Sequence, residues 1–263
     1  MLTRSYCCFR GISAGAERKL WRAGCLTWNQ LPLAGRLLSN CKTLDLVGQL
    51  PELRSALTGG VADYFLKRLP AGYRLRLWPE FSEGMAFLDV ETTGLGLRDK
   101  LTVIGLWQAG RFKQFVLGQD LHEFLEIWRK IKVLVTFNGT RFDLPVLMRT
   151  FGLSCFPPHI DLMHEAKTYG FSGGLKNIER LLGIRREVGE AGDGAEAARL
   201  WLEYEGKGDQ ISLLRLMRYN SRDVLSMVAL AGVIIKRSFD GYPGPLPDFR
   251  SLTTESLNST TTG

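Results

Sequence analysis

The chain has 263 residues, enough for one large domain or for a domain with a small additional region. Hydrophobic residues make up 45% of it and charged residues 23%, as in an ordinary soluble globular protein. Its apolar runs fall short of the roughly 20 residues of a membrane-spanning helix, and residues 1–8 lack the apolar stretch of a secretory signal. We therefore expect a cytoplasmic protein with no membrane partner.

Cysteine and histidine usage argues against a zinc centre. The five cysteines follow no paired metal-ligand spacing, and there are only three histidines. Adjacent Cys7 and Cys8 could bind a soft metal or oxidise, but free thiols are the simpler interpretation.

The net charge of +7 is concentrated in the first third of the chain. Residues 1–83 contain twelve Lys and Arg against six Asp and Glu, whereas residues 84–240 contain 21 against 19. A basic region suits a polyanionic partner, although basic proteins without one are common, so the charge is supporting evidence only.

The first third of the chain is predicted to be helical. Residues 9–31 indicate a turn, a short helix with Ser13 as N-cap and Gly24 at its end, and a second turn. Residues 45–69 have helical apolar spacing, and residues 75–82 are predicted to be a connector.

From Met85 onward the pattern changes to short strands alternating with helices. Gly110 is predicted to join two of the strands in a hairpin. This pattern indicates an α/β domain with a mixed central sheet. The expected strands are 85–90, 101–109, 111–117, 132–137 and 159–163; the expected helices are 120–130 (capped by Asp120), 142–150, 174–182, 195–205 and 209–237.

Two carboxylates stand at the end of the first predicted strand. Asp89 and Glu91 are separated by one residue, and residues two apart in a strand project from the same face. Two like charges this close usually require a cation between them. Taken alone, such a pair is more often part of a solvated turn.

Two further segments place acids at comparable positions. Asn138 and Asp143 follow the 132–137 strand, with Asp143 entering the next helix. Tyr219 and Asp223 are one helical turn apart on an apolar stretch of the last long helix, so they share a face that we expect to be drawn inward. Each segment alone has an ordinary explanation, a turn with a helix cap or a helical hydrogen bond.

The three segments in this order favour one metal site. Buried acids cost several kcal/mol unless they are paired or ligated, so four that converge imply a metal. Oxygen ligands favour Mg²⁺ or Mn²⁺, and two such ions roughly 3.5–4 Å apart would suit phosphoryl displacement. Asp161 is a weaker candidate, for which helix capping or support of the site is the better interpretation.

In order and separation, these segments resemble the three motifs of the DEDD (DnaQ-like) superfamily of 3′–5′ exonucleases. Residues 87–95 resemble the first motif, 138–143 the second, and 219–223 the third in its Tyr-x-x-x-Asp form. The sister form has a histidine where this chain has Arg218, so the resemblance is to the tyrosine (DEDDy) subclass. Segments 11–31, 73–89 and 174–179 extend it to YprB-like ribonuclease H-like proteins of bacteria, over about residues 9–237.

The resemblance implies an α/β, ribonuclease H-like fold with a mixed central sheet and flanking helices, preceded by a small helical region. It implies that Asp89, Glu91, Asp143 and Asp223 are catalytic metal ligands for two Mg²⁺ ions, with Mn²⁺ as the alternative. Tyr219 would be catalytic by orienting the water that attacks the last phosphodiester. A nucleoside 5′-monophosphate would be released, and no small-molecule cofactor beyond the metal is expected.

The same resemblance implies contacts with the 3′ end of DNA or RNA. Thr92 would contact the terminal nucleotide through its backbone, Leu95 would act as an apolar wedge, and Asn138 would form the turn or contact the substrate. Further candidate phosphate contacts are Arg141, Lys176 and Arg222.

The expected organisation has three parts. Residues 1–83 form a basic helical region, 84–240 the exonuclease domain, and 241–263 a disordered tail rich in Pro, Gly, Ser and Thr. Segment 9–31 resembles a degenerate helix-hairpin-helix, with Ser13 where that motif has its second glycine. It could grip a phosphate, or it could be a small packed unit around Trp21 and Trp28.

Two rival functions remain open. A catalytically weak nucleic-acid-binding module could keep the fold, but the four acids and Tyr219 argue against it. An endonuclease or transposase-like core would share the acids but would normally lack the Tyr-x-x-x-Asp helix.

Overall fold

The computed structural model describes residues 2–36, 40–94, 96, 99–184, 194–246, 248–249 and 252. Leu95, one of the expected substrate contacts, and residues 253–263 of the expected tail lie outside this range. Among the described helices, none is long and apolar enough to cross a membrane.

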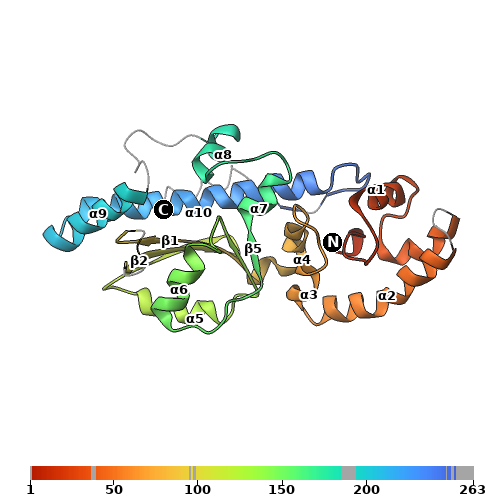
Figure 1. The fold of residues 1–263 in the computed structure, drawn as a ribbon, viewed down its shortest axis with the longest axis horizontal. Helices are drawn as coiled ribbons and strands as arrows, with labels where there is room; N and C mark the ends of the chain where they lie inside the picture. Colours follow the sequence, from red (N-terminus) through yellow and green to blue (C-terminus); the bar gives the residue numbers. More distant parts are fainter. Residues whose placement is uncertain are drawn as a thin grey trace.

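A mixed five-stranded sheet with the order β3-β2-β1-β4-β5 forms the centre of the second part of the chain (Figure 1). β1 pairs antiparallel with β2 and parallel with β4, β2 pairs antiparallel with β3, and β4 pairs parallel with β5. The strands are β1 (Met85–Thr92), β2 (Leu101–Gln108), β3 (Arg111–Val116), β4 (Val133–Thr136) and β5 (His159–Asp161).

Helices cover both faces of this sheet (Figure 1). Alternation along β1 sends Leu88 and Val90 into the apolar cluster shared with the lower helices, and Phe87 into the cluster shared with the long upper helix. Asp89 and Glu91 have the same parity as Phe87, so they point toward the upper helix. The lower helices are α5 (Phe124–Trp128) and α6 (Asp143–Phe151), and the upper ones are α9 (Gly194–Lys207) and α10 (Gln210–Ser238).

The first part of the chain is helical and packs against the far end of α10 (Figure 1). One apolar core runs through both parts: it contains Trp21 and Phe65 as well as Phe87 and Ile235. The remaining helices are α1 (Ala14–Arg22), α2 (Asn40–Thr58), α3 (Ala62–Leu66), α4 (Trp78–Phe81), α7 (Leu162–Lys167) and α8 (Leu175–Leu181); the 3₁₀ turns are Leu2–Arg4, Trp28–Arg36, Arg74–Leu77, Ser82–Gly84 and Leu121–Glu123.

The buried side chain of Arg76 joins these two parts. The guanidinium of Arg76, fully buried, donates to Glu17 Oε1 and to Ser5 Oγ, both at 2.7 Å, and also to the backbone oxygen of Ser238 at the end of α10. It lies over the ring of Phe239 at 4.3 Å. The apolar core and the Arg76–Ser238 bonds both cross residue 84, and the division at 83/84 stays a prediction.

Most of the elements expected from the sequence are present, with local differences. Asp120 does not cap the following helix; its Oδ1 accepts a hydrogen bond from Val116 N–H at 2.8 Å, across the turn after β3. The expected connector 75–82 is a series of short helical turns, and the short helix α7 was missed. The β2–β3 hairpin turns through Ala109 and Gly110, both with positive φ, as a two-residue type I′ turn requires.

Segment 9–31 is a packed unit. Ser13 caps α1 as expected, and its Oγ accepts from Ala16 N–H at 3.3 Å. Trp21 and Trp28 are each only 1% exposed, which matches the packed alternative for this segment. Phosphate binding by this segment stays a prediction; Arg10 lines a hollow of about 350 Å³ together with Lys67 and Arg68.

Candidate metal centre

The acidic strand end carries the site. On β1, Asp89 lies opposite Gly105 and Glu91 opposite Val103, and the register shifts directly after Glu91. Such irregularities occur next to functional sites because they redirect side chains. Glu91 is 7% exposed and Asp89 is half-buried, so both carboxylates are removed from bulk water.

The third carboxylate comes from α10. One oxygen from each of Asp89, Glu91 and Asp223 lies within 4.8 Å of the other two. Residues far apart in the chain thus converge because α10 crosses the face of the sheet on which Asp89 and Glu91 project. Among the described residues, these three acids form a group that could hold a metal ion.

Asp143 supports the same site from the other side of the strand. It is the first residue of α6, is 3% exposed, and its Oδ1 accepts from Val90 N–H at 3.0 Å. Asp143 lies outside the close group formed by Asp89, Glu91 and Asp223. Its charge nevertheless acts on Asp89, so the four acids share one electrostatic environment.

Burial and mutual repulsion set the protonation of these acids. Burial, then the charges of neighbouring acids, raise the pKa of Asp89 and of Glu91 well above the usual range of carboxyl groups. Burial raises the pKa of Asp143 to about 7, against hydrogen bonds from backbone N–H groups that lower it. A divalent cation would reverse this repulsion, and the all-oxygen donor set fits Mg²⁺ or Mn²⁺.

Tyr219 lies one turn before Asp223 on α10 and is 6% exposed. The ammonium of Lys176, on α8, lies 4.9 Å from the centre of the Tyr219 ring. The expected catalytic tyrosine thus lies one turn from Asp223, and its ring packs in an apolar cluster with Val103 and Val116. Sequence spacing did not indicate the cation, Lys176, that lies over this ring.

Asn220 is a site residue that the sequence analysis missed. Its side-chain Nδ2 donates to Asp89 Oδ2 at 2.9 Å and to the Asp89 backbone oxygen at 3.2 Å. It is fully buried beneath Gly105 of β2. The sequence did contain a signal for this residue: an asparagine directly after the expected tyrosine, inside the Tyr-x-x-x-Asp segment.

The turn after β4 is held by Asp161. Asn138 adopts a left-handed backbone with φ of 59°, which asparagine tolerates, and its N–H donates to Asp161 Oδ1 at 2.8 Å. Asp161 also caps α7 by accepting from Met163 N–H, as the capping interpretation expected. A Cβ on Gly139 would lie 2.1 Å from Thr136 Oγ1, so this tight turn requires glycine.

Thr92 lies at the end of β1, 6% exposed, and its hydroxyl donates to the Gly94 backbone oxygen. Just after β1, the side chain of Asp99 accepts hydrogen bonds from Gly96 N–H and from Thr93 Oγ1. Arg149 on α6 donates to the Asp99 backbone oxygen at 2.8 Å.

A cleft of about 740 Å³ opens beside the acids. Asp89, Asn138 and Asp223 line it, with Arg141, His164 and Lys167 as basic or titratable groups on the same wall. The remaining lining is mainly apolar and glycine-rich and comes from the residue after β4, from α7 and α8, and from the segment between these helices: Phe137, Met163, Phe171, Ser172, Gly173, Gly174, Leu175 and Ile178.

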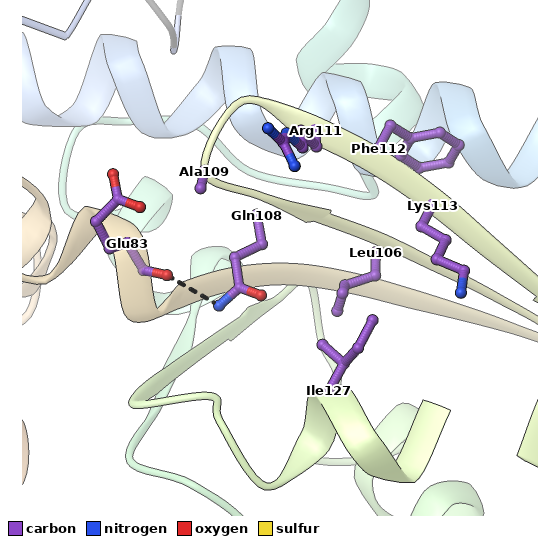
Figure 2. Close-up of a pocket in the computed structure, with 8 residues that line it drawn as sticks. All are labelled: Glu83, Leu106, Gln108, Ala109, Arg111, Phe112, Lys113 and Ile127. Carbon is purple, nitrogen blue, oxygen red and sulfur yellow. Dashed lines mark hydrogen bonds between the residues drawn. The ribbon is translucent and has the colours of Figure 1, made fainter. Parts of the chain in front are cut away.

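A second hollow, of about 610 Å³, lies at the β2–β3 turn and does not include the acids (Figure 2). Gln108 Nε2 donates to the Glu83 backbone oxygen there at 3.1 Å, and Leu106 faces Ile127 across the opening (Figure 2). Its lining brings together side chains of both signs without a cluster of carboxylates, so it resembles a surface groove more than a metal site.

Comparison with known proteins places the fold. The family model described as the RNase_H superfamily matches residues 86–235, more than half of the chain. The chain belongs to the RNase H superfamily. The matched range contains Asp89, Glu91, Asp143 and Asp223, and the expected ribonuclease H-like fold is confirmed. None of the curated proteins compared with the chain matches it.

Two solved structures are similar to this chain at low sequence identity. The family B DNA polymerase from the hyperthermophilic archaeon Pyrobaculum calidifontis is 19% identical, with a TM-score of 0.45, and the match covers 60% of this chain and 26% of the polymerase. Brucella melitensis NrnC is 24% identical, with a TM-score of 0.42, over 70% of this chain and 89% of NrnC. This chain thus spans about a quarter of the polymerase's length. Such weak similarity carries no inference about activity.

Proposed function

We propose that the protein is a metal-dependent 3′–5′ exonuclease that hydrolyses phosphodiester bonds of DNA or RNA and releases nucleoside 5′-monophosphates. The observation that carries this proposal is the convergence of Asp89, Glu91 and Asp223 within 4.8 Å, beside a cleft. The 3′–5′ polarity and the tyrosine subclass rest on the resemblance of the three motifs, above all of residues 219–223.

The metal fits the residues that are present. Asp89, Glu91 and Asp223 would hold it, with Asp143 as the fourth acid. Burial, and then the charges of neighbouring acids, raise the pKa of Asp89 and of Glu91, and a cation would relieve that repulsion. When bound, two divalent cations supply charge stabilisation at the attacking and leaving oxygens of a phosphodiester. Mg²⁺ is the expected ion and Mn²⁺ the alternative.

The protein's own residues would orient the reactants. Tyr219, one helical turn from Asp223, is proposed to hold the attacking water by its hydroxyl. A phenol with an ordinary pKa near 10 is a poor base at neutral pH, so we assign it orientation and not deprotonation. Thr92 and Asn138 are proposed to contact the terminal nucleotide, as is Leu95.

Basic groups give the cleft a means of holding a nucleic-acid strand. Arg141, His164 and Lys167 line the same cleft as Asp89 and Asp223, and phosphates of a bound strand would need positive partners. Phe137 and Phe171 in the same wall offer apolar surface to bases. The cytoplasmic location expected from the sequence stays a prediction.

A time course on 5′-end-labelled single-stranded DNA and RNA, with Mg²⁺ or Mn²⁺, tests the proposal. A ladder that shortens one nucleotide at a time supports it, provided that Asp223→Asn removes the activity. Internal cleavage would indicate an endonuclease, and tight binding without cleavage would indicate a binding module. Either of these results would contradict the proposal.

A further inference from the structure

We propose that Asn220 is a positioning residue of the metal centre, which fixes the Asp89 carboxylate in the orientation that a cation needs. The inference rests on the proposed function, because it assumes that Asp89 is a metal ligand. It concerns a neutral side chain that does not itself offer a metal-binding carboxylate.

Asn220 holds Asp89 at two points. Its Nδ2 donates to Oδ2 of the carboxylate at 2.9 Å and to the backbone oxygen of the same residue at 3.2 Å. A single amide group bonded to both the main chain and the side chain restricts the Asp89 rotamer. Since Asn220 is on α10, it also fixes the distance between β1 and the helix that carries Asp223.

The orientation of the Asn220 amide is set by Gln114 of β3. Gln114 Nε2 donates to Asn220 Oδ1 at 3.0 Å and to the Met217 backbone oxygen at 2.8 Å. If the Asn220 amide were reversed, an N–H group would face the Gln114 donor and an oxygen would face the Asp89 carboxylate. Gln114 therefore keeps the donor side of Asn220 toward Asp89.

Gly105 provides the space for this contact. It pairs with Asp89 across β1 and β2, and a Cβ at this position would lie 2.1 Å from Asn220 Oδ1 and 3.0 Å from Val224 Cγ2. Glycine inside a buried strand lowers strand stability and often marks a close approach of another group. Here the approaching group is the Asn220 amide.

The acids themselves supply the reason that a positioning residue is needed. Asp89 lies among the charges of Glu91, Asp143 and Asp223, which favour turning its carboxylate away. Groups that hydrogen-bond to metal ligands typically contribute 10–100-fold to metal affinity or activity. A role confined to folding would leave the Mn²⁺ affinity of the folded protein unchanged, so the two roles can be separated.

The test measures Mn²⁺ binding to the full chain, without nucleic acid, by electron paramagnetic resonance of free Mn²⁺. Asn220→Leu keeps the branched shape but removes the donors, and we expect its dissociation constant to rise by about 10–100-fold. Gln114→Leu, on the half-buried edge strand, should weaken binding by a smaller factor. Ser221→Ala is the matched control: it is the next residue of α10, and its hydroxyl bonds only to the Arg218 backbone oxygen among the contacts described.

The outcomes separate the inference from the proposed function. If Asp89→Asn loses Mn²⁺ binding while folded Asn220→Leu binds like the wild type, this inference is wrong and the proposed function stands. If the wild type does not bind Mn²⁺, or Asp89→Asn binds it equally well, both are wrong. Should Asn220→Leu fail to unfold cooperatively, Gln114→Leu decides, and unchanged Mn²⁺ affinity in that variant overturns the inference.

Discussion

Asp143 Oδ1 accepts a hydrogen bond from the Val90 N–H group at 3.0 Å, so the first residue of α6 is attached to the strand between the two acids of β1. This hydrogen bond holds the start of α6 next to the metal centre and occupies one oxygen of the Asp143 carboxylate. Asp143 thus has a structural contact and a proposed ligand role in the same side chain.

Substitutions of Asp143 should separate these two roles. Asp143→Asn keeps an oxygen that can accept from Val90 N–H, so we expect this variant to fold. Its nuclease activity should fall by more than the 10–100-fold that is typical when a residue hydrogen-bonded to a metal ligand is replaced. Asp143→Ala should also lose about 1–3 kcal/mol of unfolding free energy, because the buried Val90 N–H is left without its acceptor. Nuclease rates and urea unfolding of both variants check this. Full activity in Asp143→Asn would remove Asp143 from the site.

Mg²⁺ should stabilise the protein more at high pH than at low pH. The pKa values of Asp89 and Glu91 are raised in the folded chain by burial and by neighbouring acids. Without metal, the folded state is therefore stabilised relative to the unfolded state while these two acids are protonated. That stability is lost as pH rises through the folded pKa values, and a cation should restore it. Melting temperatures with EDTA and with Mg²⁺, near pH 5 and near pH 8, measure the difference. An equal response in Asp223→Asn and in the wild type would contradict this explanation.

Arg76 should be essential for the stability of the whole chain. It is fully buried, bonded to Glu17 and Ser238, and links the helical first part to the end of α10. Removal of one partner from a buried ion pair typically costs about 3–5 kcal/mol, so Arg76→Met should lower the unfolding free energy by that amount. Chemical unfolding measures the loss, with exposed Arg10→Met as the control. A change below about 1 kcal/mol would show that the pair contributes little.

His159 should make folding sensitive to acid. Burial lowers its pKa from 6.5 to about 4, and its Nε2 lies 2.8 Å from Thr136 Oγ1 at the β4–β5 pair. A lowered pKa means that stability is present above about pH 6.5 and is lost as pH falls toward 4, by up to about 3 kcal/mol. His159→Gln should flatten this part of the stability profile relative to the wild type, as measured by urea unfolding at several pH values. Parallel profiles would show that His159 does not titrate differently on folding.

The sequence predicted the sheet because its signals are local. Alternating and β-branched runs and the Gly110 turn each depend on neighbouring residues, and the strands occur close to the expected positions. The prediction that Asp120 caps the following helix was wrong for a related reason. The nearby Val116 N–H group donates to the Asp120 carboxylate instead.

Contacts between distant residues could not be derived from the pattern. The positions of Asp89, Glu91 and Asp223 were expected to converge, since strand parity and helix spacing determine where they point. The Asn220 bond to Asp89 depends on how closely α10 approaches Gly105, and the Arg76–Glu17 pair depends on the packing of the first part of the chain. Neither of these two contacts can be predicted from the helical or strand periodicity of the sequence.

The identity of the first product from a 3′-end-labelled single-stranded oligonucleotide tests the central claim most directly. With Mg²⁺ or Mn²⁺, the labelled product should be a nucleoside 5′-monophosphate from the earliest time point, a circular oligonucleotide should stay intact, and Asp89→Asn should release nothing. Labelled fragments longer than one nucleotide, cleavage of the circle, or undiminished release by Asp89→Asn would contradict the claim that these acids form an exonuclease centre.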